Sequence, residues 1–223
     1  MTLSTKAKRE TTGINIDLAK ELCKKTVEVR PGFQIHDRLS KFWAQERLAG
    51  VKKGVFDWPT AEAMALLSVA MEGNNVRLSG QDVERGTFSQ RHFVLVDQKT
   101  EEKINPILEC LKNSGDKGRF QVSNSLLSEY GVMAYEYGYA IESPKNLVIW
   151  EAQFGDFFNG AQIVIDTFLT SSEVKWLRQN GLILLLPHGF DGAGPEHSTF
   201  RMERFLQLGA TDGGYKGYQQ KVI

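Results

Sequence analysis

The feature that most constrains the fold of this chain is the apolar run GLILLLP, residues 181–187, which passes directly into HGFDGAGPEHS. A short run of such uniform apolar character predicts a strand buried on both faces, as strands are in parallel sheets that carry helices on each side. The run is far too short to cross a bilayer as a helix. The glycine-rich segment after it carries two histidines, which makes it a candidate functional loop.

Strands and helices alternate along the rest of the chain. We expect further strands at residues 76–80, 92–97, 119–125 and 146–152. We expect helices at residues 14–50 with a break at Pro31–Gly32, 60–74 with Thr60 as N-cap, 126–143, 157–169, 173–179 and 203–209. Residues 98–118 read as a loop with at most one helical turn. This order predicts a mostly parallel α/β sheet flanked by helices.

In such sheets ligands bind just beyond the carboxyl ends of the strands. We expect the run 181–187 to be a central strand, so the loop after Leu186 would lie at the correct edge for a site. His197 follows Pro195, which stiffens its approach, and a histidine held in this way can exchange a proton near neutral pH. The alternative is an ordinary surface histidine. His188 is closer to the sheet, and we expect a structural hydrogen bond from it.

Charge and cysteine content exclude several classes of protein. The chain has 27 basic and 27 acidic residues, a formal net charge of zero, which argues against a nucleic-acid-binding protein. Cys23 and Cys110 stand far apart and form neither a disulfide framework nor a zinc motif. The first residues lack the apolar core of a secretory signal. The motifs of serine hydrolases, P-loop proteins and dinucleotide-binding proteins are absent from the sequence.

Glu129 is the first candidate for chemistry. It falls in the first turn of the helix that we expect to begin at Asn124 or Ser125, and it shares a face with Val132 and Met133. A carboxylate that points inward from such a face has a raised pKa and can hold or transfer a proton near neutrality. The alternative is a surface acid that the helix dipole favours.

Two further segments follow strands and are rich in polar and aromatic side chains. In EAQFGDFFNGAQ, residues 151–162, Gln153 and Phe154 could orient and stack on a flat heterocycle, although a buried aromatic plug is the common alternative. In SGQDVERGTFSQRH, residues 79–92, Asp82 and its neighbours could recognise a ligand or a neighbouring subunit. The alternative for this second segment is a solvated loop held by salt bridges.

Four motifs in this order carry a resemblance to a known family. They are SGQDVERGTFSQRH, NSLLSEYGVMAYEYG, WEAQFGDFFNGAQ and LLLPHGFDGAGPEHS. Together they resemble the decarboxylating first component of the 2-oxoglutarate dehydrogenase complex and its relative that acts on 2-oxoadipate. The resemblance runs from about Thr11 to Leu208. It implies a transketolase-like pyrimidine-binding domain at residues 57–208, a helical connecting segment at residues 1–56 and an aberrant or disordered tail at residues 209–223.

The resemblance also implies the cofactor thiamine diphosphate and roles for individual residues. Glu129 would protonate the pyrimidine ring and thereby activate the thiazolium carbon. Phe154 would pack on the pyrimidine, with Gln153 and Asp82 also binding the cofactor, and His197 would face the substrate carbonyl or the lipoyl group. The Gly-Asp-Gly motif that binds Mg²⁺ and the diphosphate is absent here, so we expect the magnesium ligands outside this chain.

The implied reaction is the oxidative decarboxylation of 2-oxoglutarate with transfer of the succinyl group to lipoamide, in the tricarboxylic acid cycle. The alternatives are 2-oxoadipate as the substrate or a catalytically silent domain that only assembles with partners. The implied partners are a second copy, forming a homodimer through the pyrimidine-binding domain, and a lipoyl-bearing succinyltransferase, with neither nucleic acid nor membrane. The implied location is the mitochondrial matrix.

Overall fold

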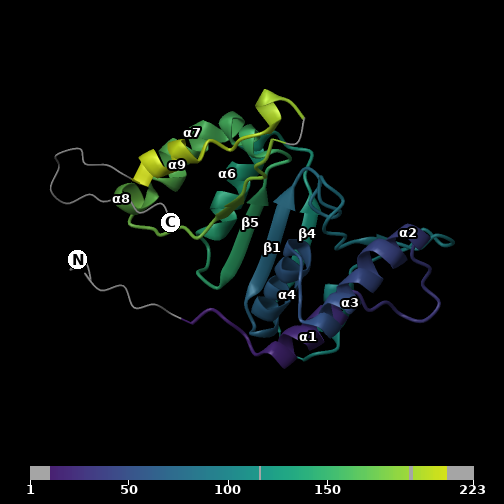
Figure 1. Ribbon diagram of the computed structural model, residues 1–223. Coiled ribbons are helices and arrows are strands. Elements are labelled where there is room, and N and C mark those ends of the chain that lie inside the picture. Colours follow the sequence, from purple (N-terminus) through teal and green to yellow (C-terminus); the bar gives the residue numbers. More distant parts are fainter. Residues whose placement is uncertain (1–10, 116, 191–192, 210–223) are drawn as a thin grey trace.

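The computed structural model describes residues 11–115, 117–190 and 193–209. Within these residues a four-stranded sheet runs through the centre of the molecule (Figure 1). Its strands, in the order β4-β1-β5-β6, are β4 (Phe120–Asn124), β1 (Asn75–Gly80), β5 (Asn146–Glu151) and β6 (Ile183–Leu185). Every neighbouring pair is parallel. The predicted fold class, a mostly parallel sheet flanked by helices, is confirmed.

Helices cover the two faces of the sheet and create two separate cores. On one face, α1 (Ile16–Lys25), α4 (Trp58–Met71) and α5 (Pro106–Lys112) bury apolar side chains against β1 and β4. On the other face, α6 (Glu129–Ala140) packs on β5 together with the helical stretch that follows that strand (Figure 1). The stretch comprises η2 (Gly155–Ala161), α7 (Gln162–Val164) and η3 (Ile165–Leu169). Phe158, Val164 and Ile165 fill this second core.

The expected helix at 157–169 therefore forms as three consecutive helical types, with a 3₁₀ turn before the α-helical turn and a π-helical turn after it. Two expected caps were wrong by a few residues. Asp57, and not Thr60, caps α4, because its side chain accepts a hydrogen bond from the Thr60 N–H at 3.0 Å. Ser128, and not Asn124 or Ser125, caps α6 through the Gly131 N–H. Each shift follows from a side chain that satisfies an otherwise unpaired N–H group.

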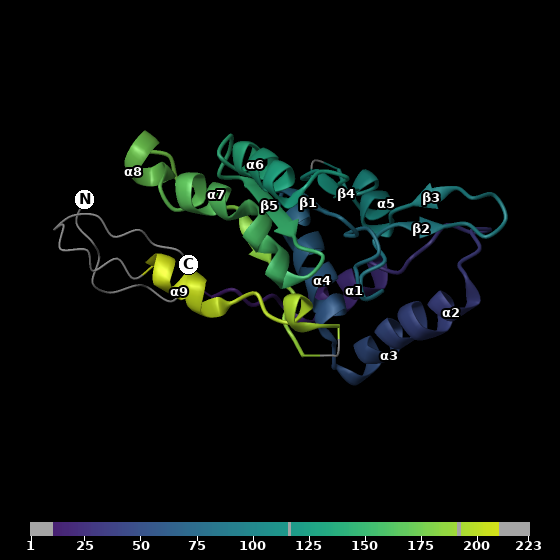
Figure 2. The same cartoon turned by 90° about the horizontal axis from the view of Figure 1, so that it is seen from above.

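An arm extends from the sheet on the side of α1 (Figure 2). It contains α2 (Asp37–Leu39), η1 (Ser40–Gln45) and α3 (Glu46–Lys53), and the antiparallel pair β2 (Leu95–Val96) and β3 (Lys103–Ile104). Val27, Phe33, Trp43, Leu95 and Ile104 form a third core there. The strand predicted at 92–97 forms only at Leu95–Val96, as β2. The segment 98–118, which we expected to be a loop, contains both β3 and α5.

The last strand differs from its prediction. β6 is an edge strand of the described sheet and not a central one, and Ile183 is exposed while Leu184 and Leu185 are half-buried. An apolar run indicates that a strand is suited to burial, but it does not determine whether that strand has one or two neighbouring strands in the sheet. The short helix α8 (Ser172–Trp176) precedes β6. The last elements, η4 (Pro195–His197) and α9 (Met202–Gly209), follow it. Phe205 of α9 packs on Phe158, with ring centroids 4.9 Å apart.

Among the described helices, none combines the length and the apolar character that crossing a membrane requires. The expected tail at residues 209–223 lies outside the described residues, apart from Gly209, which ends α9.

Candidate cofactor site at the carboxyl edge of the sheet

The carboxyl ends of the strands meet at one edge, and the register shows how closely. Gly80 at the end of β1 pairs with Asn124 of β4 and with Glu151 of β5, and Glu151 in turn pairs with Leu185 of β6. The four segments that follow these strands therefore begin side by side. They contain every site residue that the sequence predicted.

Glu129 is the first residue of α6, immediately after its cap Ser128. Its side chain is half-buried, and its Oε1 accepts a hydrogen bond from the Gln81 amide at 3.3 Å. Its Oε2 lies against Gly160 of η2, where an added Cβ would stand 3.4 Å away. The carboxylate is thus held between the segment after β1 and the segment after β5, with part of its surface still open.

Phe154 and His197 lie together. Their ring centroids are 4.6 Å apart in an edge-on arrangement, and Phe157 approaches the same imidazole at 5.1 Å. Phe88, from the segment after β1, packs edge-on to Phe154 at 5.7 Å. Phe158 is the buried aromatic plug, whereas Phe154 is half-buried and keeps part of its ring available to a ligand.

The loop that carries His197 is fastened at two points. The Asp156 carboxylate accepts a hydrogen bond from the Thr199 N–H at 2.9 Å. The Gly155 N–H donates to the Pro187 carbonyl at 2.9 Å, and a Cβ on Gly155 would stand only 2.4 Å from that oxygen. His197 Nδ1 lies 3.1 Å from Glu196 Oε1, an ion pair when the imidazole is protonated. The His188 ring lies edge-on to Phe200, with ring centroids 5.3 Å apart, and the structural hydrogen bond that we expected from it stays a prediction.

A cavity of about 1010 Å³ opens at this edge. Phe154, His197 and His188 line it together with residues that the sequence did not single out for a site, namely Trp58, Glu62, Leu186 and Phe200. Trp58 and Glu62 belong to the first turns of α4, and no local pattern marks them as neighbours of a loop more than a hundred residues away. Glu129 is not among the lining residues of this cavity.

The remaining predicted residues have mixed surroundings. Asp82 is half-buried and forms an ion pair with Arg85 within its own loop. Gln153 is half-buried at the turn before Phe154. Arg91 of the same 79–92 segment is buried and ion-paired to Glu62 and Glu151, so that segment is only partly the solvated loop considered above.

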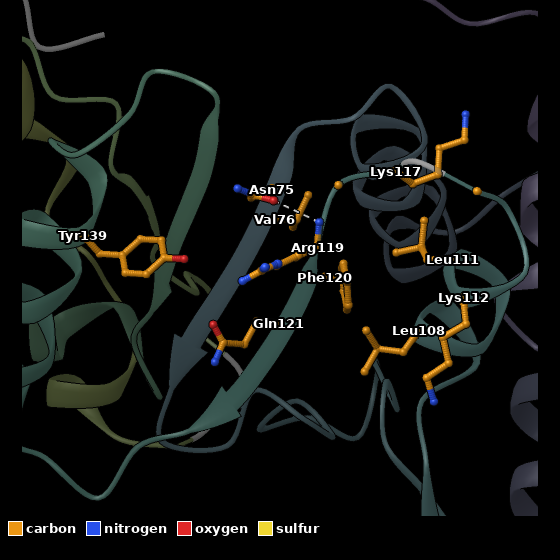
Figure 3. A pocket seen from close by; sticks show the side chains of 12 residues that line it. Asn75, Val76, Leu108, Leu111, Lys112, Lys117, Arg119, Phe120, Gln121 and Tyr139 are labelled. Atoms are coloured by element: carbon orange, nitrogen blue, oxygen red, sulfur yellow. Dashed lines mark hydrogen bonds between the residues drawn. The ribbon is translucent and has the colours of Figure 1, made fainter.

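A second cavity, of about 500 Å³, lies at the opposite end of the sheet (Figure 3). Asn75 and Arg119, at the amino ends of β1 and β4, line it with Lys117 and Tyr139. This position separates it from the candidate site. Within the described part of the chain, no group of three histidine, cysteine or acidic side chains is arranged to hold a metal ion.

A parallel α/β domain whose candidate side chains gather at the carboxyl edge of its strands belongs to the class of open α/β domains, in which ligands bind at that edge. Comparison with known families narrows that class. The sequence model of the family "Transketolase, pyrimidine binding domain" matches residues 55–211, and the chain belongs to this family.

Individual relatives support the same assignment. The chain is 55% identical over 201 residues to a probable 2-oxoadipate dehydrogenase complex component E1 homolog of Dictyostelium discoideum, covering 90% of this chain and 22% of that protein. It is 54% identical over 198 residues to the human 2-oxoadipate dehydrogenase complex component E1, covering 88% of this chain and 21% of the relative. It is 50% identical over 203 residues to the mitochondrial 2-oxoglutarate dehydrogenase of Dictyostelium discoideum, and this match covers 90% of this chain and 20% of that protein.

The chain therefore spans about a fifth of the length of these curated relatives. The resemblance that the four motifs indicated is confirmed, both for the domain and for the group of proteins.

Proposed function

We propose that this chain is the pyrimidine-binding part of a thiamine diphosphate-dependent 2-oxo acid dehydrogenase. The observation that carries the proposal is the position of Glu129 at the first turn of α6, held between the Gln81 amide and Gly160. The family membership and the E1 names of the relatives support it. The chain supplies one side of the cofactor site, and the surface that closes the other side comes from outside the described residues.

The residues present fit a pyrimidine ring. A carboxyl group with one oxygen on an amide donor and part of its surface open can present a proton to a ring nitrogen. The half-buried ring of Phe154 offers an apolar surface to a flat heterocycle. We assign supporting contacts with the cofactor to Gln153 and Asp82.

Thiamine diphosphate, when bound, supplies a nucleophilic thiazolium carbon for attack on the 2-oxo carbon of the substrate. The residues of this chain prepare that chemistry. Glu129 holds the proton that activates the pyrimidine, and the aromatic side chains around Phe154 exclude water from it. We assign to His197 the delivery or removal of a proton at the reacting oxygen or the lipoyl sulfur. Mg²⁺ and the diphosphate are held by residues outside this chain.

The proposed reaction is the oxidative decarboxylation of 2-oxoglutarate with transfer of the succinyl group to lipoamide. 2-Oxoadipate is the second candidate, because several of the relatives are named for it. The two acids differ by one methylene group, which a pocket distinguishes by only about 1–3 kcal/mol. The ratio of kcat/KM for the two acids, measured on the full-length enzyme, decides between them.

Two partners follow from this proposal. One is a lipoyl-bearing acyltransferase, which accepts the acyl group. The other is a second copy, because Leu126, Leu127, Tyr130 and Tyr135 leave an exposed apolar surface around the start of α6. Sedimentation velocity on the chain and on its Leu127→Asp variant tests the second copy. We expect the variant to dissociate at concentrations where the original is dimeric, and a monomeric original chain would contradict the dimer.

The same proposal includes a domain boundary near residue 57 and a location in the mitochondrial matrix, and one relative is named as a mitochondrial protein. Fractionation of cells that express the full-length protein tests the location.

Binding of the cofactor tests the central proposal directly. Unfolding of the chain is followed by calorimetry with thiamine diphosphate and Mg²⁺, and with thiamine diphosphate plus a chelator. At a hundredfold excess over Kd, a ligand specific for the folded state adds about 2.7 kcal/mol of stability. We expect a rise in Tm that the Glu129→Ala variant lacks. If no rise occurs and the full-length protein also fails to decarboxylate either acid, the domain is catalytically silent and the proposal is wrong.

A further inference from the structure

Arg91 makes an unusually complete set of contacts for a residue outside the predicted site. Its side chain is 1% exposed, and its guanidinium binds two carboxylates at once. Nε and one terminal nitrogen donate to Glu62 at 2.8 and 2.9 Å, and both terminal nitrogens donate to Glu151. A further bond of 3.2 Å reaches the Val83 carbonyl. All the donors of this guanidinium are therefore directed to fixed acceptors.

These acceptors lie on separate elements. Glu62 belongs to α4, Glu151 is the last residue of β5, and Val83 lies in the segment after β1. Glu151 is only three positions before Phe154. One side chain thus joins the helix, the strand that leads to the proposed pyrimidine contact, and the 81–92 loop.

The backbone around Arg91 closes that loop. The N–H groups of Arg91 and His92 donate to the Arg85 carbonyl at 2.9 and 3.0 Å. The Arg91 carbonyl accepts hydrogen bonds of 3.2 Å from the Trp43 indole and from Arg47. Phe88 stands at the tip of the loop closed in this way, and its ring packs edge-on to Phe154. The position of Phe88 therefore depends on where Arg91 is fixed.

We propose that Arg91 is a positioning residue of the cofactor site. By binding Glu62 and Glu151, Arg91 fixes the 81–92 loop and thereby holds the Phe88 ring against Phe154. Its relevance to catalysis rests on the proposed function, because Phe154 is the proposed pyrimidine contact. The positioning itself concerns only this chain and can be tested without a cofactor. In this role Arg91 acts on the site through the position of the Phe88 ring.

The chemistry of the contact explains why arginine is required. Burial alone would lower the pKa of Arg91, and the hydrogen bonds to Glu62 and Glu151 outweigh it and raise the pKa above its ordinary value. The guanidinium therefore stays charged. A lysine would keep the charge but could not serve two carboxylates in a planar, bidentate arrangement. Arg91→Lys is accordingly a substitution that keeps the charge and removes the geometry.

The test compares Arg91→Lys with a matched control, Arg77→Lys. Arg77 also binds a buried carboxylate through two bonds, to Glu136 at 2.7 and 2.8 Å, and it does not contact the 81–92 loop. Nuclear Overhauser contacts between the ring protons of Phe88 and Phe154 are measured in a phenylalanine-labelled chain. We expect Arg91→Lys to lose these contacts and Arg77→Lys to keep them, with both variants folded by circular dichroism.

Retention of the ring contacts in a folded Arg91→Lys chain, or their equal loss in Arg77→Lys, would overturn the proposal. Should Arg91→Lys fail to fold, hydrogen exchange in the unmodified chain decides. We expect the amides of Arg91, His92 and Phe93 to exchange as slowly as those of β1, and exchange at the rate of a free loop would overturn the proposal.

Cofactor binding provides a separate result. If the ring contacts depend on Arg91, the unmodified chain gains no stability from thiamine diphosphate and the full-length protein decarboxylates neither acid, the positioning role stands and the proposed function fails. If the chain binds the cofactor and Arg91→Lys weakens binding by tenfold or more while Arg77→Lys does not, both stand.

Discussion

At the scale of single residues, the placement of Glu129 depends on small neighbours as much as on the acid itself. Ser128 begins the helix at the correct point, and Gly160 leaves the space that Oε2 approaches. Gln81 then fixes the other oxygen by a hydrogen bond to Oε1. A carboxyl group in these surroundings is orientated without being fully removed from solvent.

The Glu129→Gln variant tests the role of the proton. Glutamine keeps the size of the side chain and its contact with Gln81, but it cannot donate a proton to the pyrimidine ring. In the full-length enzyme we expect exchange of the thiazolium proton, followed by NMR, to stop, while Kd for thiamine diphosphate changes by less than about tenfold. Undiminished exchange in the variant would remove Glu129 from the mechanism.

Asp97 offers a prediction about pH that is independent of the site. Its carboxylate accepts hydrogen bonds from the N–H groups of Gln34, Thr100 and Lys99, at 2.8, 3.0 and 2.8 Å. These bonds lower the pKa of Asp97 from 3.8 to about 2. Because the folded-state pKa is depressed, the stabilisation is complete above the unfolded-state pKa and disappears as the pH falls through the folded-state value.

We therefore expect NMR titration of the Asp97 carboxyl carbon to give a midpoint of about 2. Asp97→Asn should flatten the loss of stability between about pH 4 and pH 2, as measured by urea unfolding at each pH. A titration midpoint near 4 for Asp97 would contradict the contacts described.

At the scale of elements, alternation of strands and helices was sufficient to predict the parallel sheet, because each strand needs a crossover helix before the next parallel strand. The prediction failed where tertiary contacts decide. The arm strand β3 pairs only two residues, Lys103 and Ile104, and so few residues carry no periodic pattern. β6 shows that apolar character predicts a strand but does not fix its place in the sheet.

Part of the candidate site could be predicted from the order of the strands. Glu129, Phe154 and His197 each follow a strand, and parallel strands deliver such residues to one edge. Trp58 and Glu62 could not be predicted, because their place at the cavity depends on how α4 packs on the sheet. Arg91 lies in the 79–92 segment that the sequence indicated as a candidate, but its contacts with Glu62 and Glu151 could not be predicted. Whether Asp82 and Gln153 bind the cofactor stays a prediction.

One pair of elements, β1 and α6, is joined by two contacts that lead to a prediction about stability. Arg77 binds the Glu136 carboxylate near the middle of both elements, and Gln81 binds Glu129 at their carboxyl and amino ends respectively. Glu136 is 1% exposed, so removing Arg77 leaves a buried carboxylate without its partner. We expect Arg77→Met to reduce the free energy of unfolding by about 3–5 kcal/mol.

Urea unfolding of Arg77→Met, Glu136→Leu and the double variant completes this test. The double variant removes both charges and should recover most of the stability, because two apolar side chains replace the pair. Strictly additive losses in the two single variants would show that the pair contributes nothing as a pair.

At the scale of the whole molecule, the sheet has a core on each face and the arm has a third. Arg91 forms one of the polar links between the arm and the sheet, beside the contact of Cys23 with the Arg47 carbonyl and the burial of Val51 of α3 in the first core. Trp43 and Arg47 both donate to the Arg91 carbonyl, and the Arg91 side chain binds Glu62 and Glu151 of the sheet and its helix. Burial lowers the pKa of Arg47 to about 10, so this residue remains charged at neutral pH.

Because both the indole and the guanidinium of the arm depend on Arg91, we predict that the arm and the sheet unfold together. Trp43 reports on the arm and Trp150, buried in the second core, reports on the sheet. In two variants, each keeping one of these tryptophans and carrying phenylalanine at the other three tryptophan positions, fluorescence and far-UV circular dichroism are followed in guanidinium chloride. Comparing the two signals within one variant removes any effect of the substitutions on overall stability.

We expect the two signals to coincide in each variant, as they do in a two-state transition. A Trp43 signal that changes at a lower denaturant concentration than the circular dichroism of the same variant would mean that the arm opens first. In that case its hydrogen bonds to the Arg91 carbonyl would be too weak to couple it to the sheet, and the 81–92 loop would have to be held by Glu62 and Glu151 alone.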